Sequence, residues 1–403
     1  MKRLIGEIIY TLRKAAGISQ KELAEGLLSI AELSRVENEE RDEDKFILEA
    51  LLQRLGKSAD HFEVYASAEE YQLLLLRKLI MKNLLDKKLQ LAAVLLMKYQ
   101  ESPLAKRKLH EQYYHQMRAV NYFLSDGDKE DCIQNLQQAL AFTVPETKWK
   151  QEKWEEIHLC TQEIQLFLML GCMWIDNEEL KKASKVLKKI WKYIDRNVTD
   201  EAERAKLLPK CAWLRGEIYY KQGKIEKSYE ICDKGKECLA KNGNLIVMDK
   251  LLGLEERCLG ELGREKEREI IQKQLSAVDD LYSLADFRLP KERILCLLLT
   301  SEHSETLISN EVVREIRISC GLSQEELCED ICSRETLSRI ENSKQSPKRG
   351  KLQAILKRLG EERGRYYASV DTEVSVLHEK VRLYKRSWYQ KESFLYTLNR
   401  SRD

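Results

Sequence analysis

The sequence predicts an all-α protein in which one small helical module occurs at both ends of a long array of helices. Only 5 of the 403 residues are proline and 17 are glycine, so signals for strands and tight turns are few. Leu, Lys, Glu and Arg recur at intervals of three and four residues, which is typical of amphipathic helices. The stretch GISQKELAEGLLSIAELSRVEN at residues 17–38 returns as GLSQEELCEDICSRETLSRIEN at residues 321–342.

The first copy of this module carries clear signals for helix starts. An amphipathic stretch covers residues 5–16 and predicts the first helix. Two capping boxes follow, one formed by Ser19 with Glu22 and one by Ser29 with Glu32. In such a box the serine side chain accepts a hydrogen bond from a backbone N–H of the first helical turn, so each serine marks a helix start.

Two short helices joined by a turn at Gly26 predict a helix-turn-helix, and a closing amphipathic helix ends at Gly56. The pattern resembles the lambda-repressor-like (XRE-type) DNA-binding domains, and the match covers most of residues 5–65. The positions that meet the pattern of this family are Gly17, Ser19, Gln20, Leu23, Ser29, Leu33, Ser34 and Glu37.

The second copy aligns with the first without a gap at a constant offset of 304 residues. Between Leu12 and Gly56 the two copies share 19 identities over 45 positions. The caps, the turn and the LSR-x-EN signature are all kept, which indicates a true duplication. We therefore expect a helix-turn-helix domain in residues 1–66 and another in residues 308–370.

The resemblance implies that the second helix of each pair lies in the major groove of DNA, where its side chains contact base edges. In the first copy the implied contact residues are Arg13, Gln20, Ser29, Ile30, Ser34 and Arg35. In the second copy they are Arg317, Gln324, Arg334, Glu335, Thr336, Ser338, Arg339, Lys344 and Lys348.

The charge of the second copy favours DNA binding more than the charge of the first copy does. The whole chain has a net charge of +2, while residues 1–65 hold 10 basic and 13 acidic residues and residues 310–370 hold 12 basic and 10 acidic. Neither copy has the strongly basic surface of a clear DNA binder. We expect at least one copy to bind DNA, and the alternative for either copy is a packing or dimerisation domain.

Residues 68–305 predict an α-solenoid of helical hairpins. The stretch 212–243 resembles a tetratricopeptide repeat, with small Gly216 at the point where the two helices cross. Weaker echoes occur at residues 119–140, 167–190 and 256–275, spaced more loosely than a strict array. The fold class is therefore all-α, with helix-turn-helix domains at both ends of a tetratricopeptide-like α-solenoid.

A solenoid of hairpins presents a concave groove suited to a peptide or a partner helix. We expect polar and aromatic groove residues to bind such a ligand, namely Tyr114, Asn121, Gln165, Glu217, Tyr220 and Arg257. Other positions assigned to the same face are Met117, Leu168, Trp213 and Lys250. The alternative is that the aromatic and methionine residues form the hairpin core and the polar residues are only solvated.

An XRE-type domain followed by a tetratricopeptide-like domain resembles the Rgg/PlcR-type peptide-pheromone receptors. This resemblance implies a cytoplasmic homodimer that regulates transcription, binds double-stranded DNA and holds a short signalling peptide, or a partner protein, in its solenoid. The second helix-turn-helix departs from that family pattern. Either two heads on one chain contact two half-sites, or one head inhibits the other, with the acidic residues 39–44 mimicking phosphates against KRGK at residues 348–351.

The competing hypothesis is a non-enzymatic adaptor or scaffold whose end modules only dimerise or inhibit. The sequence predicts no enzyme and no cofactor, because it has no phosphate-binding glycine loop, metal-spaced His/Cys cluster or nucleophile elbow. Its 11 cysteines form no Cys-x-x-Cys pair, so we expect reduced, mostly buried thiols. We expect no membrane span, and residues 371–403 predict one amphipathic helix that docks on the solenoid or contacts a second protomer.

Overall fold

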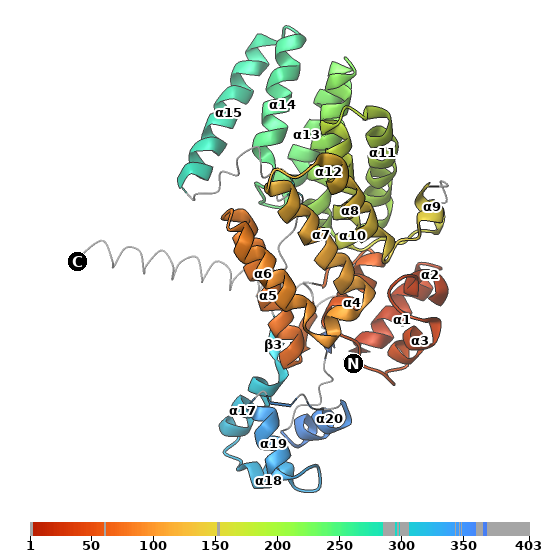
Figure 1. The fold of residues 1–403 in the computed structure, drawn as a ribbon, viewed down its shortest axis with the longest axis vertical. Coiled ribbons are helices and arrows are strands. Elements are labelled where there is room, and N and C mark those ends of the chain that lie inside the picture. The colour runs from red at the N-terminus through yellow and green to blue at the C-terminus, as the bar shows by residue number, and fades with distance from the viewer. Residues whose placement is uncertain are drawn as a thin grey trace, which may run out of the picture.

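The computed structural model describes residues 3–59, 62–150, 154–284, 306–342, 344–345, 347, 349–359 and 366–368, together with Leu295 and Leu298. Helices dominate these residues, and the predicted all-α architecture is confirmed (Figure 1). The helix expected at residues 371–403 and the side chain of Lys348 lie outside the described residues.

Each end of the chain folds into four short helices, which we call the N-terminal head (residues 3–66) and the C-terminal head (residues 306–368). The predicted capping boxes at Ser19 and Ser29 are both formed. The N-terminal head contains α1 (Ile5–Ala15), α2 (Gln20–Ala24), α3 (Ile30–Glu37) and α4 (Lys45–Arg54). The C-terminal head contains α17 (Ser309–Ser319), α18 (Gln324–Cys328), α19 (Arg334–Glu341) and α20 (Arg349–Arg358).

Between the heads lies the repeat domain, in which successive helices pair as hairpins (Figure 1). Its long helices are α5 (Ala68–Leu85), α6 (Leu89–Gln100), α7 (Lys108–Leu124), α8 (Lys129–Ala141), α10 (Thr161–Asp176), α11 (Leu180–Asn197), α12 (Glu201–Lys221), α13 (Ile225–Lys241), α14 (Met248–Glu261) and α15 (Glu265–Leu284). Its short helices are η2 (Pro103–Lys106), α9 (Glu146–Lys150) and η3 (Trp154–Glu156).

The four hairpins expected from the sequence are present as α7–α8, α10–α11, α12–α13 and α14–α15. Gly216 of α12 marks a close helix crossing, as predicted. A Cβ atom at this position would lie 2.7 Å from the Leu254 side chain and 2.8 Å from the Cys232 thiol. Only glycine therefore allows α12, α13 and α14 to approach this closely.

A small sheet joins the two ends of the chain, and nothing in the sequence predicted it. Its strands are β1 (Arg3–Leu4), β2 (Phe62–Ala66), β3 (Thr306–Ile308) and β4 (Tyr366–Ala368), in the spatial order β1-β4-β2-β3. Strand β4 is antiparallel to both β1 and β2, while β3 is parallel to β2. Strands from the two heads therefore alternate across the sheet.

The two heads bury their apolar side chains in different cores. The buried side chains of the N-terminal head form one continuous cluster with those of the repeat domain. The C-terminal head has a separate cluster that includes Val313, Leu327, Leu337 and Ile355. In Figure 1 the N-terminal head lies against the repeats, while the C-terminal head lies at the lower end of the molecule.

Candidate nucleic-acid and ligand interfaces

The helices that would enter the DNA major groove are α3 and α19, and both present exposed side chains. On α3 the exposed residues are Ile30, Ala31 and Arg35, with Ser34 half-buried. Half of the Ile30 surface is exposed, which is unusual for so large an apolar side chain.

On α19 the exposed side chains are charged. Arg334, Glu335 and Arg339 are exposed, while Thr336 and Ser338 are half-buried. Arg334 lies 2.9 Å from Glu325 of α18, and both side chains remain largely in solvent, so this ion pair is weak. Lys344 is also exposed, just after α19.

Serine residues position the start of both helices. Ser29 accepts a hydrogen bond from the Glu32 backbone N–H at 3.2 Å, and Ser333 does the same for Thr336 at 3.2 Å. The predicted DNA contact Ser29 therefore has a structural role as the cap of α3, while its side chain stays at the surface.

Arg13 lies where a phosphate cannot easily reach it, which corrects its predicted role, while Arg317 is only partly buried and its DNA contact stays a prediction. The Arg13 guanidinium donates to both carboxylate oxygens of Glu37, at 2.5 and 2.7 Å, and is only 4% exposed. Its remaining nitrogen donates to the Ile18 carbonyl at 3.0 Å. Arg317 forms the same pair with Glu341, at 2.6 and 3.0 Å. These arginines hold the first helix of each head onto the third.

Gln20 and Gln324 belong to the same arrangement. The Gln20 amide donates to Glu37 at 2.8 Å, and the Gln324 amide donates to Glu341 at 2.7 Å. The glutamate pairing orients each amide, so the rest of the side chain can still approach DNA from the start of α2 or α18. The Arg–Glu–Gln triad is the same in both heads, which shows that the duplication preserved interior contacts as well as surface residues.

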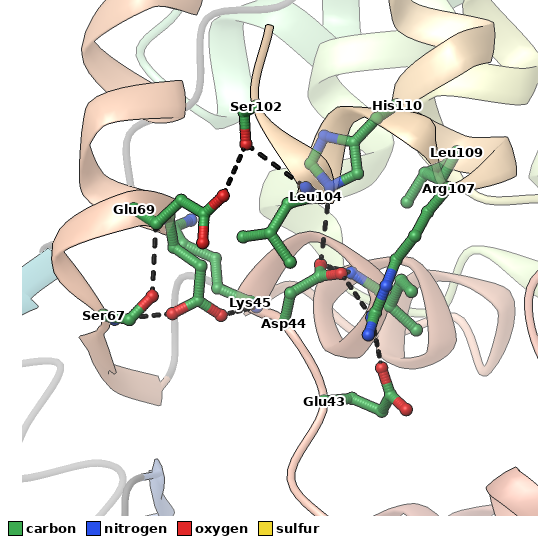
Figure 2. Close-up of polar contacts among 12 residues, drawn as sticks. Glu43, Asp44, Lys45, Ser67, Glu69, Ser102, Leu104, Arg107, Leu109 and His110 are labelled. Carbon is green, nitrogen blue, oxygen red and sulfur yellow. Dashed lines mark hydrogen bonds and ion pairs between the residues drawn. The ribbon is translucent and has the colours of Figure 1, made fainter. Parts of the chain in front are cut away.

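Two carboxylates of the acidic segment at residues 39–44, Glu43 and Asp44, contact the repeat domain, so these two do not act as phosphate mimics toward the C-terminal head. Arg107, at the start of α7, donates to Asp44 at 2.8 Å and to Glu43 at 2.5 Å (Figure 2). Glu39 instead accepts a hydrogen bond from the Gly6 backbone N–H at 2.6 Å, within the head itself. Glu43 and Asp44 therefore help to dock the head on the repeat domain.

Burial and pairing shift the pKa values at this junction. Burial alone would raise the pKa of Asp44, but the contact with His110 and the charge of Arg107 outweigh it and lower this pKa to about 2. The His110 ring lies 3.8 Å from Asp44 and is fully buried, and burial lowers its pKa. The His110 ring also bonds Tyr99 at 2.5 Å, and Arg77 donates to Tyr99 at 3.0 Å.

A second set of contacts fixes the N-terminal head to the repeat domain. Arg54 of α4 donates to Glu163 at 2.5 Å, and both side chains are buried. A Cβ atom on Gly26 would overlap the carbonyl oxygen of Thr143, and the residue has a φ of +74°. Glycine is therefore required at this contact for space, and it also adopts the positive φ without strain.

Three of the predicted groove residues come together on α12 and α14. Glu217 and Arg257 form an ion pair, and the Arg257 guanidinium lies 4.8 Å from the centre of the Tyr220 ring. The Tyr220 hydroxyl also donates to Glu261 at 3.4 Å. Arg257 is exposed, so this group forms a surface patch with a cation held over an aromatic ring.

The other predicted groove residues do not join this surface patch. Gln165, Met117, Leu168 and Trp213 are buried, as the alternative of a hairpin core expects. Gln165 and Met117 also line a small pocket between α4, α5, α7 and α10, so for these two residues the groove assignment stays a prediction. Tyr114 is half-buried against the His115 ring, with the ring centres 5.2 Å apart. Asn121 is half-buried, and its Oδ1 has no hydrogen-bond partner among the described residues. Lys250 forms an ion pair with Asp249 at 2.9 Å.

Sequence reasoning missed the junction residues Arg54, Arg107, His110 and Glu163. Arg54 is identical to Arg358 at the duplication offset, but Arg358 is exposed, so identity between the copies did not mark Arg54 as a docking residue. The partners Arg107, His110 and Glu163 carry no such signal, because they lie in the unduplicated repeat domain.

Among the described residues, no helix is long and apolar enough to cross a membrane. The same part of the chain contains no group of three or more His, Cys, Asp or Glu side chains arranged to hold a metal ion.

In comparisons with known proteins, both heads match one family model, and solved structures of low similarity are found. Residues 9–62 and 313–364 match the model of a helix-turn-helix family. No curated protein is similar enough to count as a match. The chain is similar to Bacillus thuringiensis PlcR in complex with the peptide PapR7 and DNA, at 18% identity and a TM-score of 0.44, over 70% of this chain and 96% of that one. For the apo form of PlcR the identity is 16% and the TM-score 0.42, with the same coverage. The chain thus carries two helix-turn-helix domains of one family, one on each side of a helical-repeat domain.

Proposed function

We propose that this protein is a sequence-specific DNA-binding transcriptional regulator of the cytoplasm, whose repeat domain senses a peptide or protein ligand. The observation that carries the proposal is the pair of helix-turn-helix domains whose second helices, α3 and α19, are both solvent-exposed. Arg35 and Arg339 occupy equivalent exposed positions on these helices. Each can contact a base edge or a phosphate in the major groove.

The ligand surface that we favour is the patch formed by Glu217, Tyr220 and Arg257. The exposed guanidinium can bind the carboxylate of a peptide, and the Tyr220 ring offers an apolar face beside it. Glu217 holds Arg257 in place until the carboxylate of the ligand competes for it. This chemistry suits a short peptide with a free C-terminus.

Coupling between ligand and DNA would pass through the contacts that fix the N-terminal head to the repeats. Arg54, Glu163, Asp44 and His110 are buried, and Arg107 is half-buried. A shift of α7 or α10 would therefore move the head with it. The family resemblance adds the expectation of a homodimer, in which two such units are combined.

DNA binding is tested with the full-length protein and duplex DNA from the region upstream of its own gene, across a series of salt concentrations. Wild type, Arg35→Ala and Arg339→Ala are compared. We expect affinity to fall steeply with salt, because phosphate contacts release counterions. Each substitution should weaken binding if both heads contact DNA, while loss through Arg339→Ala alone would assign binding to the C-terminal head.

Ligand binding is tested by selecting short peptides from a random library on the immobilised full-length protein. Arg257→Ala should lose the selected peptides, and amidation of the peptide C-terminus should do the same. Arg264→Ala is the matched control, because Arg264 is a second arginine over a tyrosine ring, 5.0 Å from the centre of Tyr229. Equal retention of peptides by Arg257→Ala would contradict the assigned surface.

The adaptor hypothesis gains one observation, the continuous core that joins the N-terminal head to the repeats. A head held in this way can serve as a structural part of the repeat domain. If the protein retains no DNA at any salt concentration, the adaptor hypothesis is favoured.

A further inference from the structure

The sheet binds the two heads to each other within one chain. Strands β2 and β4 are equivalent in the duplication, because Phe62 and Tyr366 are 304 residues apart. They pair antiparallel, with Glu63 opposite Tyr367, which are themselves equivalent positions. The central pair of strands therefore has the symmetry expected of two copies of one domain that associate.

Each head also contributes an outer strand that pairs with a strand of the other head. Strand β1 of the N-terminal head pairs with β4 of the C-terminal head, and β3 of the C-terminal head pairs with β2 of the N-terminal head. Neither head can complete the sheet alone. One chain therefore contains a linked pair of helix-turn-helix heads, an arrangement that many DNA-binding proteins reach only by forming a dimer.

A dimer of identical chains presents two identical recognition helices, but the linked pair here does not. Positions 34 and 35 of α3 match positions 338 and 339 of α19, as Ser and Arg in both. The three positions that open the helices all differ. They are Ile30, Ala31 and Glu32 in α3, and Arg334, Glu335 and Thr336 in α19.

These three positions lie at the N-terminal end of the helix, the part that contacts base edges in a helix-turn-helix complex. Arg334 is 67% exposed at its side chain and matches the two acceptors of guanine, and Glu335 matches the amino donor of cytosine. Ile30 and Ala31 are exposed and apolar, and the group they suit in the major groove is the thymine methyl.

We propose that a single chain binds a composite DNA site with two unlike halves, a thymine-containing half contacted by α3 and a guanine-containing half contacted by α19. This inference rests on the proposed DNA-binding function and specifies its substrate. A homodimer of such chains would place two composite sites side by side, so the repeating unit of the operator is asymmetric.

The test is selection of bound sequences from a random duplex DNA pool by the full-length protein. Wild type should enrich a site with two different halves. Base changes in the guanine-containing half should weaken binding by about 5- to 150-fold, the range expected for one good base contact.

Exchange of the helix starts provides the decisive variants. The triple variant Ile30→Arg, Ala31→Glu, Glu32→Thr gives α3 the surface of α19, and should enrich a site with two like, guanine-containing halves. The reverse variant, Arg334→Ile, Glu335→Ala, Thr336→Glu, should enrich two thymine-containing halves. The changed side chains are exposed or half-buried, and each set already exists at the start of a folded helix in this protein.

The possible failures can be told apart. Enrichment of two identical halves, or of one half only, by wild type would overturn the composite site while leaving DNA binding intact. An unchanged site in both exchange variants would do the same. Failure of wild type to enrich any sequence would overturn the proposed function and this inference together.

Discussion

The two heads share a local structure but differ in how they are built into the molecule. Both contain four helices, both cap the third helix with serine, and both hold an interior Arg–Glu–Gln triad. The N-terminal head shares its apolar core with the repeats, whereas the C-terminal head has its own. The comparison teaches that short-range patterns determine the fold of the head, while a few side chains at its outer face determine whether it docks.

Two pairs of equivalent positions show why the N-terminal head docks on the repeat domain and the C-terminal head does not. Gly26 corresponds to Asp330, which also has a positive φ of 60° but carries a side chain. That side chain would collide with the backbone at Thr143 if the C-terminal head approached the repeats as the N-terminal head does. Arg54 corresponds to Arg358, and only Arg54 meets a buried carboxylate among the described residues.

The largest difference is expected between Arg54→Ala and Arg358→Ala. Removing Arg54 leaves Glu163 buried without its cation and should cost about 3–5 kcal/mol of unfolding free energy. Arg358 is exposed and donates only to carbonyls such as Leu327 O at 3.4 Å, so its loss should cost less than about 1 kcal/mol. Urea unfolding of the two variants measures both values, and equal costs would contradict the comparison.

A smaller effect is expected from exchanging the residues at the turn. Gly26→Asp inserts a side chain where a Cβ atom overlaps Thr143, and should destabilise docking by about 1–3 kcal/mol. Asp330→Gly relieves a positive φ and should change stability by less than about 1 kcal/mol. Hydrogen exchange of the backbone amides in each head is the measurement. Unchanged exchange in α2 of the Gly26→Asp variant would show that the contact is not needed.

Acid should weaken the contact between the N-terminal head and α7. The pKa of His110 is lowered in the folded protein, so below about pH 6.5 the unfolded chain takes up a proton that the folded chain does not. Stability is thus complete above that pH and falls as the pH drops, by about 1.4 kcal/mol per pH unit for one proton. Asp44, with a folded pKa of about 2, adds a further loss below about pH 3.8.

The measurement is urea unfolding between about pH 7.5 and pH 5.5, with wild type and His110→Gln compared. The glutamine variant should show a flatter dependence on pH, whatever its absolute stability. An identical slope in both proteins would remove His110 as the cause.

The smallest effect should be the same in both heads. Ser29→Ala and Ser333→Ala each remove a helix cap and should cost about 1 kcal/mol. Thermal unfolding followed by hydrogen exchange measures both. Clearly different costs would contradict the equivalence of the two caps.

The heads and hairpins could be predicted because their signals are local. Caps such as Ser19 and close crossings such as Gly216 specify structure within one or two turns of helix. The docking partners of the N-terminal head could not be predicted, because Arg54 and Glu163 are 109 residues apart. The burial of Trp213 could not be predicted either, since a helix in a solenoid is covered on more faces than its own periodicity reveals.

The interleaved sheet also sets an order of events during synthesis of the chain. Strand β2 leaves the ribosome about 300 residues before β4, its partner, which corresponds to roughly 15–60 s at ordinary elongation rates. Through nearly all of this interval β2 lacks both of its partner strands, β3 and β4, and a neighbouring nascent chain on the same messenger can supply these strands in place of its own. The feature that links the heads within one chain is thus also a route to strand-exchanged assemblies when ribosomes are closely spaced.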